Sequence, residues 1–322
     1  MIHMTLKETQ SKILSIIKQH QTIIIHRHQR PDPDAIGSQM GLAAILKASF
    51  PDKQIYAVGK QYPGFDWLGT TDTIEDTVYE HALVIVVDTA NQPRVDDDRY
   101  TKGDAMIKID HHPNDDQFGD VMWVAPEASS TSELVFDFYT AFKDQLTCPD
   151  EAARLLYAGI VGDTGRFMYP ATSPHTMQVA GQLMTFGFSA SDVNQKEDEI
   201  SIPLARLSAF VYDQLTILPS GAAYIKLSDE VLEPFKLGDE STSSVVPLPG
   251  RLKEVTAWAI FVESKDHTFR IRLRSKGPAI NELAKRHGGG GHALASGALA
   301  HDDDEIKQVV KELDTLLLEQ GE

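Results

Sequence analysis

The sequence predicts an α/β domain with a mainly parallel sheet flanked by helices, followed by a second, smaller α+β domain. Three observations indicate this fold class. Apolar runs of strand length recur along the first part of the chain, amphipathic helical patterns alternate with them, and polar residues follow directly where several of these runs end. Strands that are apolar on both faces are typical of parallel sheets covered by helices.

The first domain alternates helical and strand patterns. An amphipathic helix is expected over residues 5–20, with its apolar residues on one side. Apolar runs predict five strands, at 22–26, 54–59, 82–88, 105–110 and 121–124. A polar loop from His28 to Asp34 follows the first strand. Helical periodicity predicts further helices at 37–48 and at about 130–143, 150–161 and 174–186.

A change of pattern near residues 188–205 predicts a domain boundary. The segment is polar and charged, and Pro203 is placed to open a connecting helix. Shorter strands and two helices follow, with strands expected at 222–227, 255–263, 268–275 and 295–300 and helices at 281–287 and 303–320. We therefore expect a first domain over 1–190, a linker with a connecting helix over 191–214, and a second domain over 215–322.

Composition and charge exclude several classes of protein. The formal net charge is −17, whereas proteins that track long nucleic acid carry a basic surface, so no long nucleic acid is expected as a partner. The one cysteine, Cys148, can form neither an intrachain disulfide nor a Cys-based zinc site, which fits a reducing compartment. No run approaches the ~20 apolar residues of a membrane helix, and the N-terminus lacks a signal core. A cytoplasmic protein with no membrane partner is expected.

The most informative feature is the triplet Asp110-His111-His112, which emerges where the apolar run 105–109 ends. Further Asp and His residues also lie at predicted strand or helix ends, namely His28, Asp32, Asp34, Asp88 and Asp163. Sites in parallel sheets form beyond the carboxyl ends of the strands, so these side chains are expected to gather there. Each Asp alone also fits a solvated turn or a helix cap. Together, four Asp and two His predict a site for two divalent ions, and hence a hydrolase.

The types of ligand restrict the metal. Asp and His without thiolates suit Mn²⁺ or Mg²⁺ better than structural zinc. Imidazole ligands favour Mn²⁺ over Mg²⁺, which prefers oxygen ligands and water. Two such ions, ~3.5–4 Å apart, support an in-line displacement at phosphorus. Two divalent metal ions are therefore the expected cofactors, with Mn²⁺ as the first choice and Mg²⁺ as the alternative.

Four segments resemble the four motifs of the DHH phosphoesterase family: HQRPDPDAIGS, VVDTAN, DHHP and GIVGDTGRF. The segment GGGGHALASGA is similar to the glycine-rich motif of the domain that accompanies this family. The longer stretches HRHQRPDPDAIGSQ and VVDTANQPRVDDDRY especially resemble the bifunctional nano-RNases, which are oligoribonucleases and pAp phosphatases. The resemblance implies a metal-binding catalytic domain followed by a substrate-binding domain.

The resemblance also implies a role for each matching residue. The metal ligands would be His28 and Asp32 for one ion, Asp34, His111 and Asp163 for the other, and Asp88 as the bridge between them. His112 would contact the scissile phosphate, with Arg166 as a further hydrogen-bond donor. Asp110 would orient the histidines. His26, just before the first motif, is expected to be structural.

The second domain carries a candidate phosphate clamp. On the strand TFRIRLRS, Arg270, Arg272 and Arg274 alternate and so share one face. A glycine run with a terminal histidine follows a predicted helix, comprising Gly288, Gly289, Gly290, Gly291 and His292. One glycine can cap the helix, and the amides of the others can form a nest for an anion. A solvated strand face and a flexible loop are the alternatives. With the resemblance, we expect the glycines and His292 to bind a substrate phosphate together with Arg272, Arg274 and Lys276.

The resemblance implies hydrolysis of short oligoribonucleotides to mononucleotides and of 3′-phosphoadenosine 5′-phosphate (pAp) to AMP, by a homodimer. The acidic chain suits such short substrates, because long polymers gain affinity from many basic contacts. A phosphodiesterase acting mainly on linear pApA in cyclic-di-AMP turnover is the alternative, and a non-catalytic nucleotide sensor is a remote one. Phe167 and Tyr169 are candidates both for stacking on a base and for core packing.

Overall fold

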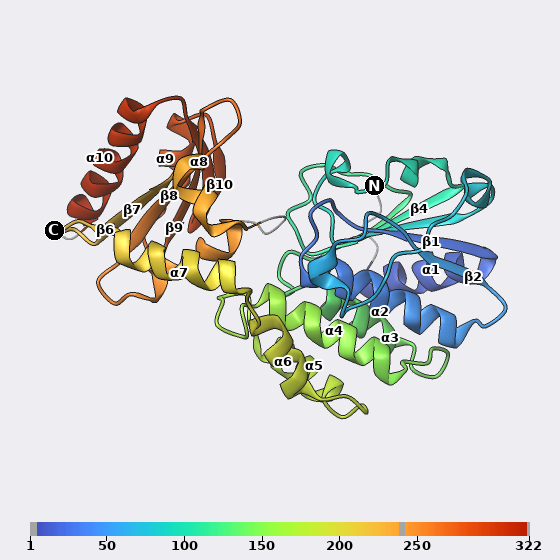
Figure 1. The fold of residues 1–322 in the computed structure, drawn as a ribbon. Helices are drawn as coiled ribbons and strands as arrows, with labels where there is room; N and C mark the ends of the chain where they lie inside the picture. The colour runs from blue at the N-terminus through green and yellow to red at the C-terminus, as the bar shows by residue number, and fades with distance from the viewer. Residues whose placement is uncertain (1–4, 238–241, 321–322) are drawn as a thin grey trace. The chain divides into compact units, whose positions relative to one another are not determined.

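The computed structural model describes residues 5–237 and 242–320, so the outermost residues of both predicted domains lie outside the described part. The chain divides into two compact units, Met1–Glu199 and Ile200–Glu322 (Figure 1). The first unit includes α6 (Ala190–Asp198), a helix that the sequence pattern did not reveal. Its residues are mostly polar and Val193 is its one buried side chain, so it lacks the apolar periodicity that predicts a helix.

The first unit contains a five-stranded parallel sheet in the order β2-β1-β3-β4-β5. Its strands are β1 (Thr22–His26), β2 (Gln54–Ala57), β3 (Leu83–Val87), β4 (Ala105–Asp110) and β5 (Val121–Val124). The mainly parallel sheet predicted from the apolar runs is therefore confirmed. β1 connects to β2 on one side, while β3 pairs with its other side, so the order reverses at β1. A crevice at the carboxyl ends of β1 and β3 follows from this reversal.

The two faces of this sheet are covered differently. Ile23 and Ile25 of β1 belong to a large core with buried residues of the helices, whereas Ile24 belongs to a smaller core with Tyr79 and Val95. The large core contains residues from α1 (Leu6–Gln19), α2 (Pro33–Ser49), α3 (Thr131–Ala141), α4 (Asp150–Asp163) and α5 (Pro174–Leu183). Figure 1 shows α2, α3 and α4 packed together beside the sheet. Short 3₁₀ turns cover the smaller core, including η2 (Asp76–Tyr79) and η4 (Asp98–Lys102).

α2 begins at Pro33, four residues before the predicted start. The side chain of Asp32 caps it by accepting a hydrogen bond of 2.9 Å from the backbone N–H of Ala35. Pro33 fits the first helical turn, because that position needs no backbone N–H donor. Asp34 therefore lies inside a helix, and the expectation that it lies in a loop is wrong.

The second unit contains a six-stranded mixed sheet in the order β10-β11-β9-β8-β7-β6. Its strands are β6 (Thr216–Ile217), β7 (Ala222–Leu227), β8 (Ala257–Glu263), β9 (Phe269–Ser275), β10 (Gly290–His292) and β11 (Ala295–Ala300). One face of this sheet packs against α9 (Asn281–Arg286) and α10 (Asp303–Gln320). The other face shares a hydrophobic core with α7 (Ile202–Gln214) and the short α8 (Asp229–Leu232). The smaller α+β domain is thus confirmed. Across the described parts of both units, no helix has the length and apolar character needed to cross a membrane.

Candidate metal centre

The six predicted metal ligands come together at the carboxyl edge of the parallel sheet. They are contributed by the ends of three neighbouring strands and by two helices: His28 after β1, Asp32 and Asp34 at the start of α2, Asp88 after β3, His111 after β4 and Asp163 at the end of α4. They form two groups with ligand atoms within 4.8 Å of one another. One group is His28, Asp32 and Asp88, and the other is Asp34, His111 and Asp163.

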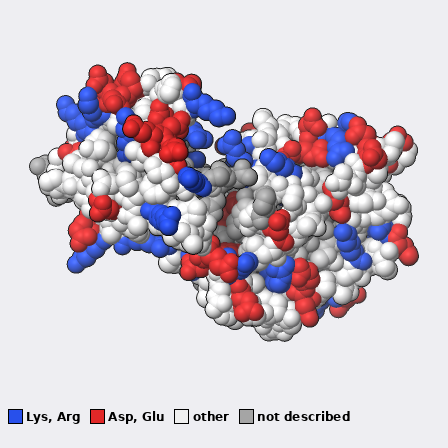
Figure 2. Space-filling model, viewed as in Figure 1, with Lys and Arg blue, Asp and Glu red and all other residues white. Residues whose placement is uncertain are grey.

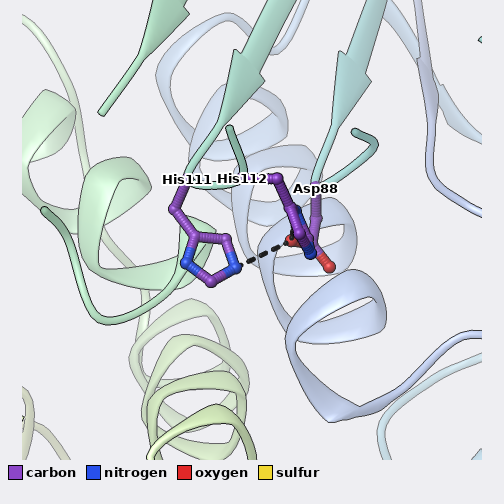
Figure 3. Close-up of side chains that lie close together, drawn as sticks. All are labelled: Asp88, His111 and His112. Carbon is purple, nitrogen blue, oxygen red and sulfur yellow. Dashed lines mark ion pairs between the residues drawn. The ribbon is translucent and has the colours of Figure 1, made fainter. Parts of the chain in front are cut away.

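Asp88 lies between these two groups. Its Oδ2 is 3.4 Å from Nε2 of His28. Its Oδ1 is 3.5 Å from Nε2 of His111, and Figure 3 shows the His111 ring directed toward this carboxylate. The carboxylate is 1% exposed. Asp88 has a φ of +49°, a left-handed conformation that is unfavourable for most residues but accessible to Asp. This backbone conformation ends β3 abruptly and directs one carboxylate toward both groups.

Both candidate histidine ligands present Nε2 to the carboxylates. Nδ1 of His28 lies 2.8 Å from the carbonyl oxygen of Gln29, and Nδ1 of His111 lies 3.4 Å from that of Ala128. A hydrogen bond donated from Nδ1 leaves the lone pair on Nε2, which is the arrangement that a metal requires. Nε2 of His28 is then 3.6 Å from Asp32, and Nε2 of His111 is 3.3 Å from Asp163.

The N-terminus of α3 holds two of the carboxylates, and the sequence analysis did not identify it. Asp34 accepts hydrogen bonds from the backbone N–H groups of Thr131, at 2.7 Å, and Ser132, at 2.9 Å. The hydroxyl of Thr131 donates to Oδ1 of Asp88 at 3.1 Å. Free N–H groups at a helix start stabilise negative charge. The hydroxyl of Ser130 accepts a hydrogen bond from the backbone N–H of Glu133 and so caps this helix. A serine three residues before a glutamate can indicate a helix start in the sequence, but it does not indicate that the helix start lies beside Asp34.

His112 is held differently from His111. Its Nδ1 donates a hydrogen bond of 2.8 Å to Oδ1 of Asp110, and its side chain is 31% exposed, compared with 15% for His111. With Nδ1 used by Asp110, Nε2 is the nitrogen of His112 that can bind a further group, although His112, Asp88 and His111 also form a group that could hold a metal ion. Burial opposes protonation, but the hydrogen bond to Asp110 and the charge of Asp88 raise the pKa of His112 above its ordinary value. Such a ring is suited to donating a hydrogen bond to an anion.

The cluster concentrates buried negative charge. Burial and the charges of Asp88 and Asp163 raise the pKa of Asp34 well above its ordinary value. Burial alone would lower the pKa of His28, but hydrogen bonds to Asp32 and Asp88 raise it to about 10. Both shifts show that the site favours additional positive charge. Buried carboxylates are paired or coordinate metals, so this donor set fits divalent cations.

Comparison with known protein families agrees with this geometry. A model of the DHH family N-terminal domain matches residues 22–160, and a model of the DHHA1 domain matches residues 238–319. The chain belongs to the DHH family. All the candidate metal ligands except Asp163 lie within the first match, and Asp163 follows it by three residues.

Similar DHH proteins cover nearly the whole chain. The probable bifunctional oligoribonuclease and PAP phosphatase NrnA of Streptococcus mutans is 50% identical, over 95% of this chain and 98% of its own. The bifunctional oligoribonuclease and PAP phosphatase NrnA of Bacillus subtilis is 43% identical, over 96% and 99%. Among solved structures, an exopolyphosphatase-related protein from Bacteroides fragilis has a TM-score of 0.84 and 26% identity, covering 96% of this chain and 97% of its own.

Arg166 and Phe167 are the last two residues of the final DHH motif, and Tyr169 follows it. Nη2 of Arg166 donates hydrogen bonds to a carboxylate oxygen of Asp198, at 2.6 Å, and to the carbonyl oxygen of Glu197, at 3.3 Å. To bind a phosphate, the guanidinium would have to exchange or share these partners, and its role stays a prediction. Phe167 packs against the core, whereas Tyr169 is 48% exposed.

The candidate clamp residues lie in the second unit. Arg272 in β9 is paired with Gly297 in β11, which is paired with Gly290 in β10. Arg274 is likewise in register with Ala295 and then His292. Residues paired across strands, and residues two apart on one strand, share a face. Two arginines, a glycine and a histidine thus lie on one face, and the β11 residues between them, Ala295 and Gly297, are small.

The glycine run has structural roles as well. Gly288 has a φ of +66° and follows α9 as its left-handed cap. A Cβ at Gly289 would collide with the backbone of Gly297, and a Cβ at Gly291 would lie 2.7 Å from the carbonyl oxygen of Ala295. A loop was expected here, but Gly290–His292 forms the edge strand β10. Gly290 is less constrained, because a Cβ there would meet open space and its φ is not positive. Lys276 is exposed, and its Nζ donates to the carbonyl oxygen of Leu252.

Proposed function

We propose that this DHH protein is a dinuclear metal-dependent phosphoesterase that hydrolyses short oligoribonucleotides to mononucleotides and dephosphorylates pAp to AMP. The observation that carries the proposal is the position of Asp88, whose two carboxylate oxygens face two separate ligand groups. Two relatives named as bifunctional oligoribonuclease and PAP phosphatase, at 50% and 43% identity over nearly the full chain, supply the substrate class.

We propose Mn²⁺ as the resident metal, with Mg²⁺ as the alternative. His28, Asp32 and Asp88 would hold one ion, and Asp34, His111 and Asp163 the other, with Asp88 shared. One imidazole per group favours Mn²⁺ over Mg²⁺. Bound divalent ions would activate a water and neutralise charge on the phosphoryl group.

The protein's own groups supply orientation and hydrogen bonds. Thr131 and the N-terminus of α3 hold the carboxylates of Asp88 and Asp34 in place. His112 keeps Nδ1 on Asp110 and offers Nε2 to a phosphoryl oxygen, where its raised pKa favours a protonated donor. A donor fixed in this way stabilises charge that develops in the transition state without further reorganisation.

In the second unit, we propose that Arg272, Arg274 and the neighbouring β10 bind another phosphate of the nucleotide. The support is the register that places both arginines on one face with Gly290 and His292. Guanidinium groups bind phosphate through paired hydrogen bonds. Gly290 lets an anion approach the backbone because it presents no side chain. Gly288, Gly289, Gly291 and Lys276 would contribute backbone amides and positive charge at the edges of this surface.

Short substrates fit the charge of the protein. The net charge is −17, and on the face drawn in Figure 2 acidic and basic side chains are interspersed. A specific observation keeps pApA as a second candidate substrate: the cyclic-di-AMP phosphodiesterase PdeA of Listeria monocytogenes is 25% identical over 92% of this chain. The match covers only 47% of that protein, so we rank pApA below oligoribonucleotides and pAp as a substrate. The homodimer stays a prediction.

The proposal is tested by turnover with defined metals. The full chain is stripped with a chelator and supplied with Mn²⁺, Mg²⁺ or Zn²⁺. The initial rates on pAp, pApA, dinucleotides and pentanucleotides are then compared. We expect Mn²⁺ to restore the highest rates, with pAp and oligoribonucleotides both cleaved. Preference for pApA over both would select the alternative activity.

A pair of matched variants distinguishes activity of this protein from activity of a contaminating phosphoesterase. Asp88→Asn should abolish the metal-restored activity, whereas Asp98→Asn, a change at an exposed carboxylate, should leave it intact. Nucleotide binding without turnover under any metal would contradict the proposal and support a sensor.

A further inference from the structure

Lys108 is a fully buried lysine in the central region of the parallel sheet. It lies in β4 two residues before Asp110, and its side chain is 0% exposed. Strand neighbours on this face, such as Val84, Val86 and Met106, are apolar and pack in the smaller core. Lysine is almost never fully buried unless it is paired, so packing alone does not account for a cation here.

The ammonium group of Lys108 donates to three acceptors on two segments. Nζ donates hydrogen bonds to the carbonyl oxygen of Ala90 at 3.1 Å, to Oδ1 of Asn114 at 3.2 Å and to the carbonyl oxygen of Asp116 at 3.3 Å. Ala90 lies two residues after Asp88, and Asn114 lies two residues after His112. Lys108 therefore fixes the segments that follow both β3 and β4, from the side of the sheet opposite the helices.

A fourth contact connects Lys108 to the proposed chemistry. Nζ lies 3.5 Å from Oδ2 of Asp110, and both side chains are fully buried. Oδ2 has no hydrogen-bond partner among the described residues, whereas Oδ1 accepts from both the backbone N–H and Nδ1 of His112. A buried carboxylate with one oxygen unpaired depends on a nearby cation. His112 pairs with Oδ1 of Asp110, and Lys108 is the cation that pairs with Oδ2.

We propose that Lys108 is a positioning residue for phosphoester hydrolysis, which holds the Asp110 carboxylate so that it receives Nδ1–H of His112 and leaves Nε2 facing the substrate. The line of contacts runs from Nζ to Oδ2 of Asp110 at 3.5 Å, and from Oδ1 to Nδ1 of His112 at 2.8 Å. The inference rests on the function proposed above. Lys108 touches neither substrate nor reacting atoms, so its effect passes through His112.

The kinetic test is a double-mutant cycle on the Mn²⁺-loaded full chain. Lys108→Met and Asp110→Asn should each lower kcat for pAp by roughly 10- to 100-fold, the usual range for groups that orient a site residue. KM should change little, because the phosphate clamp lies elsewhere. The double variant should be no slower than the slower single variant, because both changes release the same ring. Lys226→Met, which removes a partly exposed lysine paired with Asp303, is the matched control and should keep the wild-type kcat.

A second measurement does not depend on activity. In the wild-type protein, Nδ1–H of His112 should give a downfield, slowly exchanging proton resonance, because it donates to a buried carboxylate. The His112→Asn variant assigns this resonance by its loss. Lys108→Met should remove it or make it exchange rapidly. If Lys108→Met does not fold, Lys108→Gln provides the same test, since it keeps a polar side chain but removes the charge.

The two measurements separate the two proposals. A wild-type chain that cleaves none of the nucleotides would overturn the proposed function, while loss of the resonance in the Lys108 variants would still establish the positioning contact. A resonance and kcat that are both unchanged in the Lys108 variants would overturn the role of Lys108. Additive losses of kcat in the double variant would also overturn it, because they would mean that Lys108 acts by a route other than Asp110.

Discussion

The hydroxyl of Thr131 donates a hydrogen bond of 3.1 Å to Oδ1 of Asp88, although the two residues are 43 positions apart. The same residue donates its backbone N–H to Asp34. One residue at the start of α3 thus contacts both Asp88, which lies between the two groups of candidate ligands, and Asp34, which belongs to one of them. Thr131 is not itself a candidate ligand, so a substitution of Thr131 tests whether α3 orients the carboxylates without removing a ligand.

Thr131→Val should lower activity while preserving the fold. Valine has nearly the same shape as threonine and keeps the backbone N–H to Asp34, so only the hydrogen bond to Asp88 is lost. We expect turnover or Mn²⁺ affinity to fall by roughly 10- to 100-fold, as for other residues that orient metal ligands. The measurement is the initial rate as a function of Mn²⁺ concentration. Thr140→Val, at an exposed position of the same helix, is the control; equal effects of the two changes would contradict this role.

Asp88→Asn should remove nearly all activity and weaken the binding of both ions. Asparagine tolerates the left-handed conformation that Asp88 adopts at a φ of +49°, so the backbone should be retained and the charge alone is lost. Metal content per chain, measured by elemental analysis after dialysis, should fall from two ions. Retention of two ions and an appreciable rate would show that Asp88 is not shared between them.

His112→Ala should lower kcat by roughly 100-fold or more, a typical loss when a donor to a developing anion is removed. The metal content should stay near that of the wild type, because Nδ1 of His112 is used by Asp110. His81→Ala, a change at an exposed histidine, provides the control for both readings. Loss of an ion from the His112 variant would instead assign His112 to the metal.

Cys148 should react slowly with thiol reagents in the folded protein. Burial raises the pKa of its thiol from an ordinary value of 9.0 to about 12, because the thiolate is poorly solvated there. At pH 8, this shift reduces the thiolate fraction by roughly 1,000-fold, and the thiolate is the reactive form. Labelling should be fast in urea and slow in buffer at the same pH. Rapid labelling of the folded chain would mean that the segment around Cys148 opens readily.

Local sequence was sufficient for the strands of the parallel sheet and for the candidate ligands that gather at its edge. β4 matches its run from Ala105 to Asp110, because four of its first five residues are apolar and suit a buried strand, with Lys108 as the exception. The candidate ligands lie together as predicted, because strand ends in a parallel sheet meet at one edge. The start of α2 was missed because the charged and proline-rich segment before Gly37 resembled a loop, although Asp32 and Pro33 are a favourable cap and first residue for a helix.

Contacts between distant segments could not be predicted in this way. Thr131 and Ser132 reach Asp34 across 97 and 98 positions of sequence, and no local pattern encodes that distance. Lys108 was a polar residue inside an apolar run, and its partners became apparent only once the segments after β3 and β4 were placed. β10 was missed because glycine has a low intrinsic preference for strands, whereas pairing with β11 determines its conformation.

Arg272→Ala should raise KM for pAp and dinucleotides, with little effect on metal binding. Arg272 lies in register with Gly297 and Gly290, on the proposed phosphate-binding face. Removing a charge-assisted hydrogen bond to a bound phosphate costs about 1.5–3 kcal/mol, which corresponds to a roughly 10- to 100-fold rise in KM if the contact is equal in the ground and transition states. The matched control is Arg270→Ala. Arg270 lies on the same strand face, is exposed and is paired with Leu299, farther from β10. The two variants lose the same charge from the same strand, so a larger rise in KM for Arg272→Ala would show a local contact with the phosphate. Equal rises in KM would mean that only the overall positive charge of the domain matters, and Arg272 would then not belong to the clamp.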